Sequence, residues 1–184
     1  MIPGEKQMTE RALAETEHIY IRALTAHEHG DAATAAQLYE EILAQFPDAD
    51  VVLYNQGLAL FELERFTEAV SVFSRAAELR GDDADTWYNL ALALKREQRY
   101  AEATDAYKRA LALQPDDQDV LFNLANCCRE SGENEQAAAY YEQVLALEPK
   151  HVSALNNFAY LSHLQQEYDR AEELYQRLLD LEPE

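Results

Sequence analysis

Residues 84–117 read ADTWYNLALALKREQRYAEATDAYKRALALQPDD, and the same 34-residue pattern recurs along most of the chain. Within this stretch apolar side chains fall three and four residues apart, first around Leu90 and Leu94 and then around Ala103 and Tyr107. That spacing predicts two amphipathic helices, each with one apolar face. Pro115 follows the second helix and is expected to stop it. Each 34-residue stretch is therefore expected to form one helical hairpin.

Four columns of residues repeat at this interval without an insertion. The column that closes each hairpin holds Pro47, Gly81, Pro115, Pro149 and Pro183. An alanine column holds Ala35, Ala69, Ala103, Ala137 and Ala171, and an aromatic column four residues later holds Tyr39, Phe73, Tyr107, Tyr141 and Tyr175. A small column on the first helices holds Ala23, Gly57, Ala91, Ala125 and Ala159. Small residues let two helices approach closely, and the aromatic ring is expected to fill the seam with the next hairpin.

The period, the small and aromatic columns and the closing proline resemble the tetratricopeptide repeat (TPR) family. The third unit matches the signatures of both helices through Trp87, Leu90, Ala91, Leu94, Ala103, Tyr107, Ala110 and Pro115. The resemblance covers five units, 16–49, 50–83, 84–117, 118–151 and 152–184, and residues 1–15 are expected to extend the first helix. It implies an all-α fold, a right-handed α-solenoid superhelix of antiparallel helical hairpins whose first helices line the concave side.

Turn and cap residues are predicted from the same columns. Gly30 and Gly132 are expected to adopt positive φ at the ends of first helices. Three aspartates follow the closing column and are expected to cap the next helix: Asp48, Asp82 and Asp116. Lys150 interrupts that column, so the fifth unit is expected to begin less sharply.

The charge balance argues against two classes of partner. The chain has 35 acidic residues against 15 basic ones, which gives a formal net charge of −20. Such a charge repels nucleic-acid phosphates and anionic membrane surfaces over a Debye length of about 8 Å. No stretch has the apolar length of a signal sequence or a membrane span. We therefore expect a cytoplasmic protein that binds neither nucleic acid nor membrane.

Residues that carry chemistry elsewhere show no catalytic or metal-binding pattern here. Cys127 and Cys128 are neighbours on one expected helix, point in different directions and occupy core positions, so a packing role is predicted. His27 and His29 lie on different helix faces, unlike a pair of metal ligands. No glycine-rich phosphate loop or nucleophile elbow occurs. We expect no catalytic residues, no metal site, no cofactor and no enzymatic activity.

The first helices carry one asparagine per unit from the second unit onward: Asn55, Asn89, Asn123 and Asn157, here called the asparagine ladder. An asparagine side chain both donates to and accepts from a peptide backbone. Amides spaced along a groove are therefore suited to holding an extended peptide. The alternative is a structural role, in which the amides bond neighbouring helices.

Other residues on the same face complete the predicted peptide-binding groove: Tyr54, Tyr88, Phe122, Leu58, Leu92, Asn126, Lys95, Arg96 and Arg129. Tyr54, Leu58 and Phe61 would form an apolar shelf. Lys95, Arg96 and Arg129 form a basic cluster, which is expected to meet acidic groups of a ligand. The alternatives are that the aromatic residues pack between hairpins and that the cations belong to a solvated face.

One TPR subclass does not fit this groove. Family members that clamp a C-terminal carboxylate carry lysine or arginine around the asparagines of three successive repeats. The matching positions here hold Tyr54, Leu58, Asp119 and Asn123 in one frame and Tyr88, Leu92, Ser153 and Asn157 in the next. We therefore expect no carboxylate clamp.

The last unit ends at Glu184 without a polar capping helix. Its seam residues Tyr175, Leu178 and Leu179 are expected to be exposed, either because the chain is a piece of a longer protein, which we favour, or because this face binds a partner or another copy. Two functions stay open. One is a protein–protein interaction scaffold that binds an extended peptide or partner segment in the concave groove. The other is the N-terminal recruiting arm of a longer enzyme, a methyltransferase or glycosyltransferase, with its catalytic domain beyond Glu184.

Overall fold

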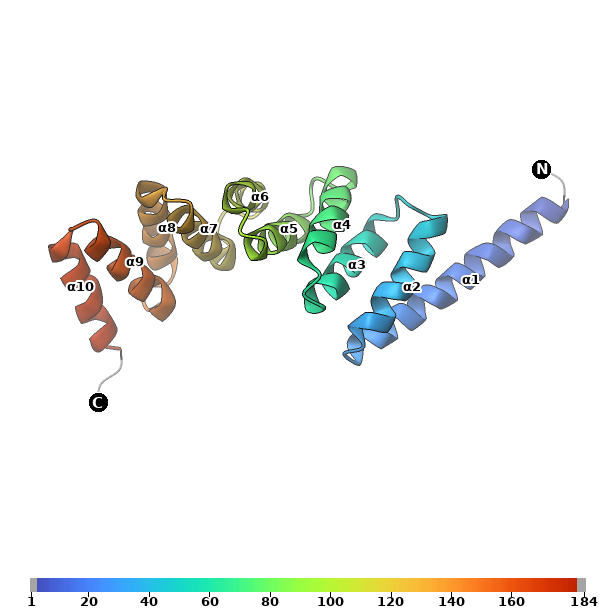
Figure 1. The fold of residues 1–184 in the computed structure, drawn as a ribbon, viewed down its shortest axis with the longest axis horizontal. Helices are drawn as coiled ribbons and strands as arrows, with labels where there is room; N and C mark the ends of the chain where they lie inside the picture. The colour runs from blue at the N-terminus through green and yellow to red at the C-terminus, as the bar shows by residue number, and fades with distance from the viewer. Residues whose placement is uncertain (1–2, 182–184) are drawn as a thin grey trace. The chain divides into compact units, whose positions relative to one another are not determined.

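The computed structural model describes the backbone of residues 3–181 and the side chains of residues 13–181. Regular structure in this part of the chain is entirely α-helical and forms five hairpins (Figure 1). The helices are α1 (Pro3–Glu28), α2 (Ala32–Gln45), α3 (Asp50–Glu62), α4 (Phe66–Leu79), α5 (Ala84–Arg96), α6 (Tyr100–Leu113), α7 (Gln118–Glu130), α8 (Asn134–Leu147), α9 (Val152–Leu164) and α10 (Tyr168–Leu179). The predicted all-α class of helical hairpins is confirmed. Pro183 lies outside the described residues.

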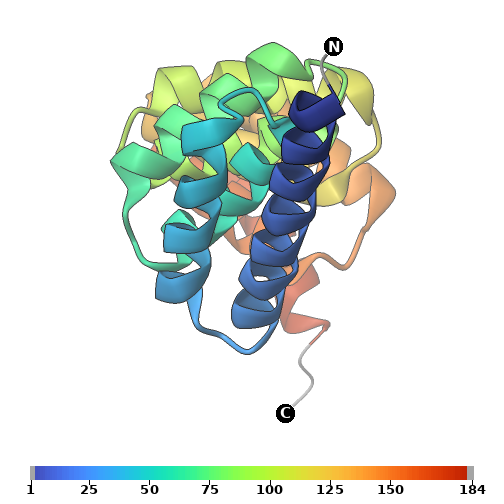
Figure 2. The same cartoon turned by 90° about the vertical axis from the view of Figure 1, so that its right-hand side faces the viewer.

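The chain divides into two compact units, Met1–Asp82 and Asp83–Glu184. In the first unit α1 packs on α2, α2 on α3 and α3 on α4. In the second unit each helix from α5 to α10 likewise packs on the next one. Figure 2 shows α1 and α2 side by side and antiparallel, joined by a short turn.

The alanine and aromatic columns form the core of each hairpin. Ala69 and Ala103 are fully buried, and so are the rings of Phe73, Tyr107 and Tyr141. Burial of each large side chain contributes about 1.5–3 kcal/mol to stability. The small column has an equally direct cause at Gly57, where an added Cβ would lie 2.5 Å from the ring of Phe73.

All five hairpin turns place one residue in the left-handed region, at the same position of each unit. Gly30 and Gly132 have φ of 79° and 82°, which confirms the prediction for these glycines. The other turns use residues that gave no glycine signal: Glu64 with φ 57°, Gln98 with φ 60° and Gln166 with φ 64°. The next backbone N–H bonds back to the last helical turn, as from Arg65 to the carbonyl of Leu60 at 2.9 Å. This is the Schellman arrangement, which satisfies carbonyls at a helix end.

The predicted caps at Asp48, Asp82 and Asp116 are wrong by one residue. The side chains that accept from the first turn of the helix are those of Asp83 in α5, Asp117 in α7 and His151 in α9. From the second repeat onward the first helix begins at the first residue of the repeat, so the cap stands two positions after the closing proline or glycine rather than one. Lys150 is therefore not in the capping column, and the fifth unit does have a side-chain cap. In the second repeat, 50–83, the cap position is held by Ala49, which makes no side-chain hydrogen bond to the helix.

Candidate peptide-binding site

In the compact unit Met1–Asp82 the first ladder residue forms a hydrogen bond between the first helices of two successive repeats. Nδ2 of Asn55 in α3 donates to Oη of Tyr20 in α1 at 3.0 Å. Both side chains are half-buried. The Tyr20 ring lies 6.2 Å from the ring of Tyr39, which holds the hydroxyl in place. Asn55 therefore joins α3 to α1.

The same kind of bond recurs in the compact unit Asp83–Glu184, where Nδ2 of Asn123 in α7 donates to Oη of Tyr88 in α5 at 3.3 Å. The amide also donates to the carbonyl of Asp119 at 3.0 Å. Its oxygen accepts from Nζ of Lys95 at 3.0 Å. Both N–H groups of Asn123 are thus engaged, and one lone pair of its oxygen holds a cation.

Asn157, the last ladder residue, has a different partner because the aromatic residue of the preceding repeat is Phe122, which has no hydroxyl. Nδ2 of Asn157 instead donates to Oδ1 of Asn126 at 2.9 Å, and Oη of Tyr141 donates to the same oxygen at 2.6 Å. Asn126 is only 8% exposed, so this predicted groove residue lies in the interior and offers a ligand little surface.

Asn89 is half-buried and, like Asn123, bonds to its own helix. Its Nδ2 donates to the carbonyl of Asp85 at 2.9 Å. Asn55, Asn123 and Asn157 thus bond neighbouring first helices, which is the contact expected from a structural role. Sequence spacing carried a signal for the pairing, since Tyr20 and Tyr88 stand 35 residues before Asn55 and Asn123.

The aromatic residues of the predicted groove pack inside their own hairpins. Ring centroids lie 6.0 Å apart for Tyr54 and Phe73 and 5.8 Å apart for Tyr88 and Tyr107. Phe122 lies 6.3 Å from Tyr141. Tyr54, Tyr88 and Phe122 nevertheless remain half-buried, as do Leu58 and Leu92, so each keeps some surface in contact with solvent.

The basic cluster of the second unit is held by two different contacts. Lys95 of α5 is fixed by Asn123, as described above. Arg129 of α7 pairs with Glu130 at 2.6 Å, and its side chain is 26% exposed. The Nε of Arg129 is buried and has no hydrogen-bond partner among the described residues. Arg96 is exposed at the end of α5.

Burial keeps the hydroxyl groups next to these cations protonated. It raises the pKa of Tyr88, and the nearby charge of Asp119 raises it further. Burial also raises the pKa of Tyr141, while hydrogen bonding to Arg129 acts in the opposite direction. The Tyr88 hydroxyl is therefore available as a neutral acceptor for Asn123.

Cys127 and Cys128 are both fully buried and free. Burial raises the pKa of Cys127 to about 11 and also raises that of Cys128. A thiol held in its neutral form is a poor nucleophile and a poor metal ligand. Within the described part of the chain no group of three His, Cys, Asp or Glu side chains is placed to hold a metal ion. None of the described helices has the length and apolar character needed to cross a bilayer.

A family model for the TPR domain of cytochrome c-type biogenesis protein H matches residues 76–184. A general tetratricopeptide repeat model matches residues 20–85. The chain belongs to the tetratricopeptide repeat family. No curated protein sequence gives a significant match.

Solved TPR structures share the fold over nearly the whole chain. A MamA crystal structure has a TM-score of 0.86 at 22% identity and covers 91% of this chain and 92% of its own. MamA 41-end from Desulfovibrio magneticus RS-1 has a TM-score of 0.84 at 17% identity, with 90% and 94% covered. YrrB, described as a TPR protein with an unusual peptide-binding site, has a TM-score of 0.84 at 20% identity, with 95% and 92% covered.

Proposed function

We propose that this TPR protein is a protein–protein interaction scaffold that binds an extended acidic segment of a partner. The segment would lie across the first helices α5 and α7, in the compact unit Asp83–Glu184. The observation that carries the proposal is the Lys95 ammonium, held 3.0 Å from the Asn123 oxygen on the next first helix. A cation fixed in this way loses little side-chain freedom when a ligand carboxylate or phosphate arrives.

The hydrogen bonds between helices change what the asparagine ladder offers a ligand. Since the amide N–H groups of Asn123 are engaged, the ladder would contribute mainly carbonyl oxygens that accept from ligand backbone N–H groups. Tyr88 and Leu92 would supply apolar contact beside them. The expected ligand is an extended peptide with an apolar residue and one or more acidic or phosphorylated residues.

A peptide-array screen followed by titration of the recovered peptides tests this function. Lys95→Glu with Arg129→Glu should lower the affinity for acidic peptides at least tenfold. The affinity of the wild-type protein should fall as salt rises, because the contacts are ionic. The matched control is Lys108→Glu with Arg109→Glu, two exposed cations on the second helix α6. Equal affinity of the Lys95, Arg129 double variant and wild type would rule out this face as the binding site.

A further inference from the structure

Gln56 stands out among the residues at its position of the repeat. The corresponding residues of the later units are apolar: Leu90, Leu124 and Phe158. Gln56 lies on α3 and is only 8% exposed. No hydrogen bond to its amide occurs among the described residues. Its amide is not among the buried polar atoms that lack a partner, and it lines a solvent-accessible cavity, so it is open to a ligand that enters from solvent.

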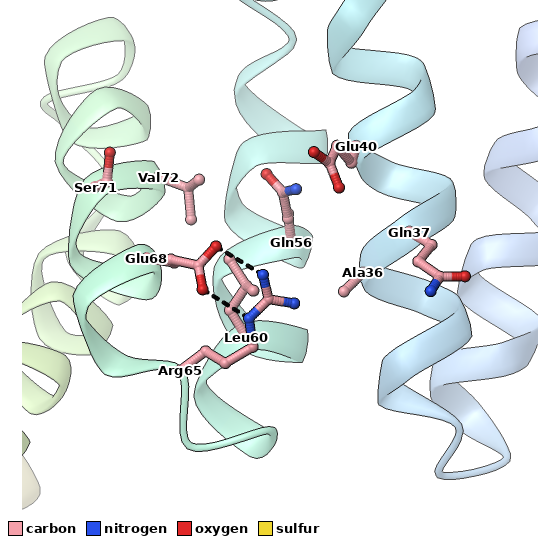
Figure 3. Close-up of a pocket in the computed structure, with 9 residues that line it drawn as sticks. All are labelled: Ala36, Gln37, Glu40, Gln56, Leu60, Arg65, Glu68, Ser71 and Val72. Carbon is pink, nitrogen blue, oxygen red and sulfur yellow. Dashed lines mark hydrogen bonds and ion pairs between the residues drawn. The ribbon is translucent and has the colours of Figure 1, made fainter.

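The Gln56 amide lines a cavity of about 190 Å³ between α2, α3 and α4 of the first unit. Figure 3 shows Gln56 and Glu40 on facing sides of this space, with the Arg65 guanidinium extending into it. The floor is apolar, because Leu60 and Ala36 are buried there. The rim is polar and exposed, and includes Glu40 and Ser71.

The cavity carries one uncompensated negative charge. Arg65 donates to both carboxylate oxygens of Glu68, each at 2.7 Å, so these two charges offset one another. Hydrogen bonding to Glu68 raises the pKa of Arg65, and the nearby charge of Glu40 adds to this effect. Glu40 therefore leaves a negative charge at the rim, near the side-chain amide of Gln56.

We propose that this cavity binds a cationic side chain, lysine or arginine, presented by a partner protein. The methylene stem would lie on Ala36 and Leu60, since long cationic side chains cover apolar surface with their stems. The charged head, which only donates hydrogen bonds, would meet two acceptors: Oε1 of Gln56 and the Glu40 carboxylate. The net charge of −20 favours the approach of a basic partner. This site is separate from the basic cluster of the second unit and selects ligands of the opposite charge.

The side-chain NH₂ resonance of Gln56 in the ¹⁵N-labelled full chain reports on the site directly. N-acetyl-lysine methylamide and N-acetyl-arginine methylamide should shift it saturably at millimolar concentration. The uncharged N-acetyl-norleucine methylamide should bind at least tenfold more weakly, because it lacks the donor head. Glu40→Gln should weaken the binding of both cations by a similar factor. Equal shifts with norleucine, tighter binding of N-acetyl-glutamine methylamide, or no saturable shift with either cation would each overturn the proposal.

Gln56→Leu separates a binding role from a structural one. Leucine already occupies this position at Leu90 and Leu124, so the variant should fold with an unfolding midpoint no lower than wild type. The backbone resonances of Glu40 and Ser71 should then no longer respond to the lysine probe. Undiminished binding by Gln56→Leu would contradict the proposal, and Glu40→Gln gives an independent decision if the leucine variant does not fold.

Discussion

Tyr107 and Tyr141 occupy the same position in successive hairpins, yet their hydroxyl groups differ. Both rings are fully buried. Oη of Tyr141 donates to Asn126, whereas Oη of Tyr107 has no hydrogen-bond partner within the described residues, because Leu92 stands where Asn126 stands one unit later. An unpaired buried hydroxyl costs about 1–3 kcal/mol, while a paired one contributes about 0.5–1.5 kcal/mol.

The same substitution should therefore have different effects at the two sites. Tyr141→Phe should lower the free energy of unfolding by about 1 kcal/mol. Tyr107→Phe should leave it unchanged or raise it, since the ring stays and only the unpaired hydroxyl is lost. Urea denaturation followed by circular dichroism measures both. Equal losses in the two variants would show that a hydrogen bond missing from the structure serves Tyr107.

At the scale of elements, the turns between paired helices have one backbone conformation and several residue types. Gln98 adopts φ of 60° and Gly132 adopts φ of 82° at the same position of adjacent hairpins. A left-handed conformation costs a residue with a Cβ about 1–2 kcal/mol, and glycine avoids that cost. An added Cβ at Gly132 would meet no atom within 4 Å, so packing does not enter the comparison.

Exchanging residue types between these two turns should change stability in opposite directions. Gln98→Gly should raise the free energy of unfolding by about 0.5–1 kcal/mol, less than the full conformational cost because glycine also increases the entropy of the unfolded chain. Gly132→Ala should lower it by about 1–2 kcal/mol. Thermal denaturation of both variants checks this. A destabilised Gln98→Gly protein would mean that the glutamine side chain, and not the backbone, sets this turn.

Most of the helices and turns were predictable from the sequence, and the errors in those predictions have identifiable causes. The helices follow from the alanine, small and aromatic columns, because the first two are buried in every hairpin and the aromatic column is buried in all but the last. The left-handed residues Glu64 and Gln98 carry no turn signal of their own and are found only by their position relative to Gly30. The caps were misplaced by one residue because aspartates stand side by side at Asp82–Asp83 and Asp116–Asp117. Composition alone does not choose between them.

The candidate sites were less accessible to sequence reasoning. The Asn123–Tyr88 bond joins residues 35 positions apart, and its existence depends on how successive hairpins stack. Sequence therefore left ligand binding and a structural role as alternatives. Asn126 was placed on the groove because it stands four residues after Phe122 on the same expected helix, but its hydrogen bonds with Tyr141 and Asn157 hold it in the interior. Gln56 was not singled out, since nothing in the sequence marks its amide as unpaired.

At the scale of the whole molecule, the final seam differs from its internal counterparts. Tyr175 is 39% exposed and Leu179 is 66% exposed, whereas Tyr141 and Leu145 at the same positions are 0% and 8% exposed. In the internal seam the ring of Tyr141 stacks on Phe158 of the next first helix at 5.8 Å. The exposed surface is therefore the kind that other hairpins of this chain cover with a helix.

We expect this 184-residue chain to associate through the exposed seam as its concentration rises. Added salt should strengthen the association, because it screens repulsion between copies that each carry a net charge of −20. Leu178→Glu with Leu179→Lys should shift sedimentation velocity profiles toward the monomer, and Leu147→Lys, at an exposed leucine on α8, should not. A monomer at every concentration and salt level would exclude self-association.

The Lys95–Asn123 contact has a mechanical consequence. The first helices α5 and α7 are joined by a few polar side chains, and one of them is the cation that we propose binds the ligand. A ligand carboxylate that shares the Lys95 ammonium with Asn123 would weaken the contact between α5 and α7. Occupancy would then alter the elasticity of the array, and a force probe pulling on the two ends would read a softer spring when the peptide is present.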